Sequence, residues 1–123
     1  MPGNDPSAGL TASIIKFRQY RTNILPAELF SEPAWDLLLE LFLADAEGRR
    51  ITAREVAEKS SISPGVMSRW LQHLSKIGYV IGDGTGDLDD MLTLSAQALQ
   101  RMEQIIDRAH ILYAEASYSR TSE

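Results

Sequence analysis

Apolar residues recur at helical intervals in two stretches of the N-terminal part of the chain. The first stretch, residues 10–24, predicts a helix that ends before Pro26. The second stretch follows Ser31-Glu32-Pro33, where a serine would cap a helix that has proline in its first turn. It is the most apolar helical segment of the chain and ends near Gly48. We expect this second helix to lie at the centre of the core.

Two short capped helices are predicted next to each other in the middle of the chain. Thr52-Ala53-Arg54-Glu55 has the capping-box pattern, so a helix over 53–59 should begin there. Ser63-Pro64 again places an N-cap before a proline, and opens a predicted helix over 63–77 that ends at Gly78. Two helices separated by a few residues are typical of a helix-turn-helix.

A β-hairpin and a long helix complete the pattern. Residues 79–81 are β-prone, residues 82–87 are typical of a turn, and residues 91–94 can return as the partner strand. From Ser95, a predicted cap, a last helix carries one broad apolar stripe to about residue 113. Three helices followed directly by a two-stranded hairpin are the layout of a winged helix-turn-helix.

The predicted fold class is therefore mainly α with a small β-hairpin, a winged helix-turn-helix flanked by N- and C-terminal helices. The chain has 123 residues, 44% of them hydrophobic, which suffices for one compact domain and is too short for two. The predicted boundaries are a disordered tail at 1–9, a single domain at 10–117 and a polar tail at 118–123, with the winged helix-turn-helix at 32–94 and the flanking helices at 10–25 and 95–117.

Composition excludes several classes of protein. No apolar run approaches the roughly 18 residues of a membrane span, and the N-terminus lacks the features of a signal peptide, so we expect a soluble cytoplasmic protein. The absence of cysteine excludes disulfides and thiol chemistry. His73 and His110 lack metal-ligand spacing, and no catalytic set has supporting context. We therefore expect no enzyme activity, no cofactor and no metal.

The net charge of −5 is distributed unevenly. Between Arg49 and Val80, six basic residues face two acidic ones, so this segment carries +4 and the rest of the chain −9. A basic patch on an acidic body leaves one surface attractive to phosphates. A chance cluster of charges on a solvated face would have the same composition.

The predicted helix 63–77 has an apolar side and a polar side. In a major groove, Arg69 is the best candidate for direct readout, because a guanidinium can bond two guanine acceptors, and Gln72 could pair with adenine. A core helix whose polar side merely faces water would show the same stripe. The candidate DNA-binding residues are Thr52, Arg54, Ser63, Gly65, Ser68, Arg69, Gln72, His73 and Lys76.

Three local features agree with one known pattern. Ala57 is a small residue midway through the first short helix, Ser68-Arg69 lies in the second, and Leu74 through Val80 forms its exit. In these positions the segment from Val56 to Val80 resembles the helix-turn-helix of the MarR family. The resemblance implies a homodimer on a pseudo-palindromic DNA operator, and a small aromatic or anionic effector. It implies dimer contacts from the apolar stripes of the terminal helices, namely Ile14, Phe17, Leu99, Met102, Ile106 and Leu112.

The predicted wing departs from that family's pattern. Family members usually carry Asp-x-Arg there, with the arginine near the minor groove, whereas this chain has Asp87-Leu88-Asp89-Asp90. Together with Asp83, four carboxylates would face phosphates and weaken binding. An EF-hand is disfavoured because its twelfth position, counted from Asp83, is Leu94 and not glutamate. A solvated acidic turn or a protein-docking surface fits this stretch better.

Two functional hypotheses follow from these patterns. The first is a sequence-specific, dimeric transcription regulator that binds double-stranded DNA. The second is a winged-helix module that docks protein partners and binds little or no DNA, because a fold does not fix a function.

Overall fold

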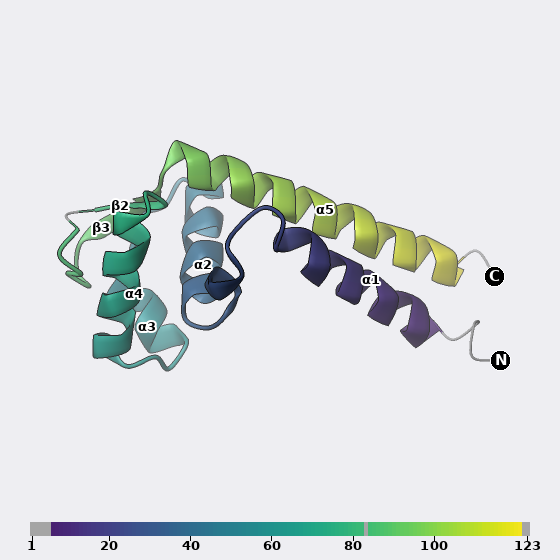
Figure 1. Ribbon diagram of the computed structural model, residues 1–123, viewed down its shortest axis with the longest axis horizontal. Helices are drawn as coiled ribbons and strands as arrows, with labels where there is room; N and C mark the ends of the chain where they lie inside the picture. Colours follow the sequence, from purple (N-terminus) through teal and green to yellow (C-terminus); the bar gives the residue numbers. More distant parts are fainter. Residues whose placement is uncertain (1–5, 83, 122–123) are drawn as a thin grey trace. The chain divides into compact units, whose positions relative to one another are not determined.

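The computed structural model describes residues 6–82 and 84–121 (Figure 1). The described part is mainly helical with a small antiparallel sheet, which confirms the coarse prediction. Its elements are α1 (Pro6–Arg21), the 3₁₀ helix η2 (Ala27–Phe30), α2 (Ala34–Ala46), β1 (Ile51–Thr52), α3 (Ala53–Lys59), α4 (Pro64–Lys76), β2 (Val80–Ile81), β3 (Met91–Leu94) and α5 (Ala96–Thr121).

The chain forms two compact units. The central unit is Ala27–Met102, and the terminal unit combines Met1–Pro26 with Glu103–Glu123. Helix α5 contributes its first residues to the central unit and the remainder to the terminal unit.

Helix α2 supplies much of the core of the central unit. Leu37, Leu38 and Leu41 are buried along it, and it packs against η2, α3 and β3. Apolar burial of this kind is the main favourable term in folding, at roughly 25 cal/mol for each Å² removed from water. The apolar pattern of the sequence therefore located the core helix correctly.

The predicted cap of α2 is wrong. The Ser31 hydroxyl donates a hydrogen bond to the carbonyl of Glu28 at 2.8 Å, and α2 begins at Ala34 without a side-chain cap. The reason is the turn η2, which the sequence pattern did not reveal. Because η2 ends immediately before Ser31, this hydroxyl closes that turn instead of starting the next helix.

The caps of the two short helices are confirmed. The Thr52 hydroxyl accepts the backbone N–H of Glu55 at 3.3 Å, and the Ser63 hydroxyl accepts that of Val66 at 3.3 Å. Gly78 follows α4 with φ of +82°, a left-handed conformation that glycine adopts without steric cost. These local signals fix where α3 and α4 begin and where α4 ends.

The hairpin is confirmed and extended by a further strand. Strands β2 and β3 are antiparallel, with Val80 opposite Leu94. Strand β1 was not predicted; it pairs antiparallel with β3 through Ile51 opposite Leu92, which gives the order β1-β3-β2. Two residues are too short to show the alternation that identifies a strand.

The terminal unit is built from α1 and the C-terminal part of α5. The rings of Phe17 and Tyr113 lie 6.4 Å apart, and the guanidinium of Arg108 lies 5.4 Å from the ring centre of Tyr20. Both helices extend beyond the predicted domain boundaries, since residues 6–9 and 118–121 are helical rather than tail. Proline is favoured in a first helical turn, which fits a start at Pro6; the rest of the predicted N-terminal tail lies outside the described residues.

Candidate nucleic-acid interface

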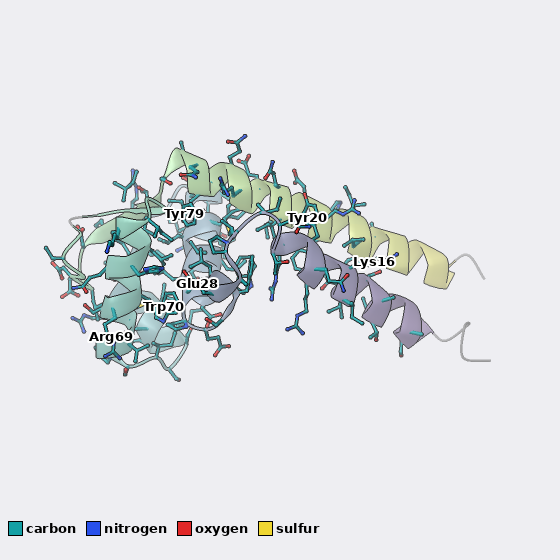
Figure 2. The ribbon with its side chains drawn as sticks, viewed as in Figure 1. Lys16, Tyr20, Glu28, Arg69, Trp70 and Tyr79 are labelled. Atoms are coloured by element: carbon teal, nitrogen blue, oxygen red, sulfur yellow. The ribbon has the colours of Figure 1, made fainter. Side chains whose placement is uncertain are left out.

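Helix α4 separates its apolar and polar sides as the sequence predicts. Met67, Leu71 and Leu74 are buried against the rest of the central unit, with α3 as a close neighbour. Arg69 and Lys76 are exposed, and Figure 2 labels Arg69 on α4. One side of α4 therefore holds the helix in place while the other faces outward.

The N-terminal end of α4 is accessible. Gly65 is exposed, and a Cβ placed there would meet no atom within 4 Å. Ser63 is exposed as well, although its hydroxyl already caps the helix. Thr52 is half-buried and caps α3 in the same way. Among the predicted DNA contacts at helix ends, the backbone around Gly65 is the one that a duplex can approach most closely.

Two predicted base-reading residues contact the chain itself. The Ser68 hydroxyl donates to the carbonyl of Gly86 at 2.8 Å, and the Gln72 amide donates to the carbonyl of Thr85 at 2.8 Å. Both acceptors belong to the part of the β2–β3 connection that we call the hairpin loop, Gly84–Asp90. The loop therefore lies against the polar side of α4.

Glycine at position 86 makes this approach possible. A Cβ there would lie 2.5 Å from the Ser68 hydroxyl oxygen and 2.9 Å from Cγ of Gln72, and the φ of Gly86 is +83°. Any other residue would strain the backbone and collide with α4. From the sequence pattern, Gly86 was predicted only to be part of a turn.

Arg54, a predicted phosphate contact, binds the acidic part of the loop. Its Nε lies 2.6 Å from one carboxylate oxygen of Asp89, and its terminal nitrogen lies 3.2 Å from the other. The hydrogen bond from Arg54 holds the pKa of Asp89 below its ordinary value, and the same bond raises the pKa of Arg54. The backbone N–H of Arg54 also donates to the carbonyl of Leu88 at 3.0 Å.

His73 faces η2 and not the outer side of α4. Its Nε2 lies 3.1 Å from a carboxylate oxygen of Glu28, and its ring packs edge-on to Trp70 at 5.7 Å. These three side chains line a pocket of about 320 Å³ together with Val66 and Arg69. No local sequence pattern pointed to Glu28, because it lies 45 residues from His73.

Several basic side chains in the segment between Arg49 and Val80 are paired with acidic side chains of the same chain. Arg49 pairs with Glu47, and Lys59 lies 2.9 Å from Glu40. Arg50, Arg69 and Lys76 have no acidic partner in the part of the chain that the structure describes. Since exposed ion pairs contribute at most about 1 kcal/mol, a phosphate can exchange with such a carboxylate.

The predicted dimer contacts divide by exposure. Met102 and Leu112 are 0% and 3% exposed, so their side chains fill the chain's own core and offer a second copy no surface. Phe17, Leu99 and Ile106 are half-buried, and Ile14 is 36% exposed. The predicted dimer contacts left out other exposed apolar side chains of the terminal unit, which are Leu10, Ile15, Ile111 and Tyr113.

The hairpin loop brings several carboxylates together without a metal-binding arrangement. Across residues 6–82 and 84–121, no group of three or more His, Asp and Glu side chains is placed to hold a metal ion. Asp83, the first of the four wing aspartates, lies outside the described residues. Within the same ranges no helix has the length and apolar character that crossing a membrane requires.

The chain matches no protein-family model, no curated protein and no solved structure in a comparison with each. Its function must therefore be inferred from the arrangement of its own residues.

Proposed function

We propose that the protein is a sequence-specific transcription regulator that binds double-stranded DNA through α4, as a MarR-like winged helix-turn-helix homodimer. The observation that carries the proposal is the sequence of α3, a short turn, α4 and an antiparallel hairpin, with both helices capped at their N-termini. Helix α4 is buried on one side and turns Gly65, Arg69 and Lys76 outward.

The outward side of α4 fits what a major groove offers. The groove admits an α-helix, and the N-terminal part of a recognition helix meets base edges. Exposed Gly65 allows the backbone to come close, and Arg69, four residues later, lies on the same side of the helix. Lys76, near the C-terminal end, is suited to a phosphate.

The homodimer would form through the terminal unit. Leu10, Ile14, Ile15 and Ile111 expose apolar surface that a second copy can cover. Two-fold symmetry would present two copies of α4 to half-sites about 34 Å apart, one helical turn of DNA.

The proposal includes a small aromatic or anionic effector. The pocket beside α4 has a volume of about 320 Å³ and is lined by the indole of Trp70 and the guanidinium of Arg69. It is also lined by His73 and by Glu28, whose carboxylate lies 3.1 Å from His73. This volume lies at the lower end of the range for small-molecule sites, which begins near roughly 300 Å³.

The test is a fluorescence titration of the protein with the duplex upstream of its own gene at several salt concentrations. Arg69→Ala should lower specific affinity by about tenfold or more, because a bidentate guanine contact contributes roughly 1–3 kcal/mol. Arg18→Ala removes the same charge from an exposed position on α1 and should change affinity less than about twofold. Undetectable or salt-insensitive binding by the natural chain would contradict DNA recognition.

A docking module for protein partners is the second candidate. The contacts of the hairpin loop with Ser68, Gln72 and Arg54 favour it, because they leave less of α4 open to a duplex. A chain that binds no DNA even at low salt would support this function over the first.

A further inference from the structure

The hairpin loop offers hydrogen-bond acceptors of the kinds that DNA has. It offers them to side chains that the sequence predicts as DNA contacts. Carbonyl oxygens of Gly86 and Thr85 accept from Ser68 and Gln72, as a carbonyl oxygen of a base would. The Asp89 carboxylate accepts two hydrogen bonds from the Arg54 guanidinium, as a phosphate would.

Several contacts hold the loop in this position. Leu88 is 7% exposed and its carbonyl accepts the backbone N–H of Arg54. The carboxylate of Asp87 accepts the backbone N–H of Asp89 at 2.9 Å, which orders the turn that carries the Arg54 partner. The loop is thus fixed both to α3 and to α4.

The contacts with the loop and with a duplex exclude each other. The Ser68 hydroxyl has one proton to donate, and it is directed at Gly86. The carbonyls of Gly86 and Thr85 already accept from the Ser68 hydroxyl and the Gln72 amide on the side of α4 that a base edge would approach. Exposed carboxylates at Asp87 and Asp89 would also repel phosphates drawn to that side.

We propose that the hairpin loop is an intramolecular competitor of DNA, which occupies Ser68, Gln72 and Arg54 in the free protein. This inference rests on the proposed function. With the loop in place, a duplex meets α4 around Gly65, Arg69 and Lys76. When the loop moves away, the three side chains that it engages become available to the duplex and the carboxylates leave the interface, so affinity rises.

The first variant displaces the loop by steric means. Gly86→Ala places a methyl group against Ser68 and Gln72, whereas the matched control Gly84→Ala has nothing within 4 Å. Both glycines have positive φ, +83° and +79°, so both variants carry similar backbone strain and differ in the collision. The side-chain amide resonance of Gln72 in a ¹⁵N NMR spectrum reports loop displacement without DNA. It should shift in Gly86→Ala and not in Gly84→Ala.

The second variant weakens the ion pair at the other end of the loop. Asp89→Asn removes the charge that binds Arg54, and Asp87→Asn removes an equal charge from the same loop. Asparagine at 87 keeps an oxygen that can accept the N–H of Asp89, so the turn should persist. A general charge effect would act alike in both variants, whereas competition predicts the larger effect at position 89.

The probe is a fluorescently labelled mixed-sequence duplex, titrated by anisotropy at several salt concentrations. We expect Asp89→Asn and Gly86→Ala to bind about three- to tenfold tighter than the natural chain, and the two controls to change less than about twofold. The salt dependence of Asp89→Asn should steepen by about one unit on logarithmic axes, because Arg54 gains a phosphate.

The outcomes separate the competitor role from DNA binding itself. Unchanged or weaker binding by Gly86→Ala, with the Gln72 resonance shifted, would overturn the competitor role while DNA binding stands. An unshifted Gln72 resonance would overturn it as well, because the loop would not be in contact. Absence of binding by every variant, both to this duplex and to the duplex upstream of the gene, would overturn the proposed function, and the competitor role with it.

Discussion

Asp89 links the hairpin loop to α3 through a single side chain. Both partners of its ion pair are about half exposed or more, so the pair contributes little to global stability. Its effect is local, because it fixes which acceptor the Arg54 guanidinium faces. A residue of this kind sets the position of a loop rather than the stability of the fold.

Acidification should release this contact. The pKa of Asp89 is lowered in the folded state, so its contribution is complete above its ordinary value of 3.8 and disappears as the pH falls through the lower folded value. We expect the Arg54 Nε resonance to move in that acidic window, and to stay constant there in Asp89→Asn. A resonance that is unchanged through the window in the natural chain would contradict the ion pair.

Sequence patterns predict residue roles when the partner is near in the chain. Thr52, Ser63 and Ser95 were predicted as caps, and each accepts the backbone N–H three residues ahead. Ser31 is the exception, because its hydroxyl donates to the preceding turn instead. The loop partners of Ser68 and Arg54 lie 18 and 35 residues away, and no local pattern encodes such pairs. The sequence therefore named the polar residues of α4 without showing what they bind in the free protein.

At the scale of secondary-structure elements, helix α4 depends on the capping of its first turn. Pro64 has no backbone N–H to satisfy, and Ser63 accepts the N–H of Val66, so the N-terminus is formed before any DNA arrives. Elements without such signals escaped prediction, as β1 did, because its two residues show no periodicity. The pattern of apolar residues predicted which segments are helices. A two-residue strand such as β1 forms only because the rest of the sheet is in place to pair with it.

Loss of this cap should destabilise the central unit. Ser63→Ala should lower the free energy of unfolding by about 1 kcal/mol, because Val66 loses its acceptor. Ser63→Asp restores an acceptor at the helix N-terminus and should retain the stability of the natural chain. Urea titration followed by circular dichroism measures both. Equal midpoints for the alanine and aspartate variants would show that the cap contributes nothing.

At the scale of the whole molecule, the chain combines a central unit that presents α4 with a terminal unit that exposes apolar surface. Among the large apolar side chains of α1 that the structure describes, Ile15 is the most exposed, at 51%. Met102 and Leu112 were expected to serve the dimer, yet both are buried, because an apolar stripe shows which residues are apolar and not which neighbour covers them. The exposed fraction of a side chain separates residues that can contact a second copy from residues that are buried in the chain's own core, whereas periodicity does not.

Formation of the dimer should depend on the exposed apolar side chains of the terminal unit and not on those of the central unit. Ile15→Asp should convert a dimer into a monomer in sedimentation equilibrium, since a charge would be buried at the contact. Leu43→Asp is the matched control, because Leu43 is 46% exposed on α2 of the central unit. A natural chain that sediments as a monomer at micromolar concentration would refute the dimer.

The glycine at position 86 gives the competitor proposal a consequence for how mutations change DNA binding. A single codon change there would insert a side chain between the loop and α4. On our proposal, operator occupancy would then rise although every base-contacting residue kept its identity. A population under pressure for stronger regulation would thus find its shortest mutational route outside the recognition helix.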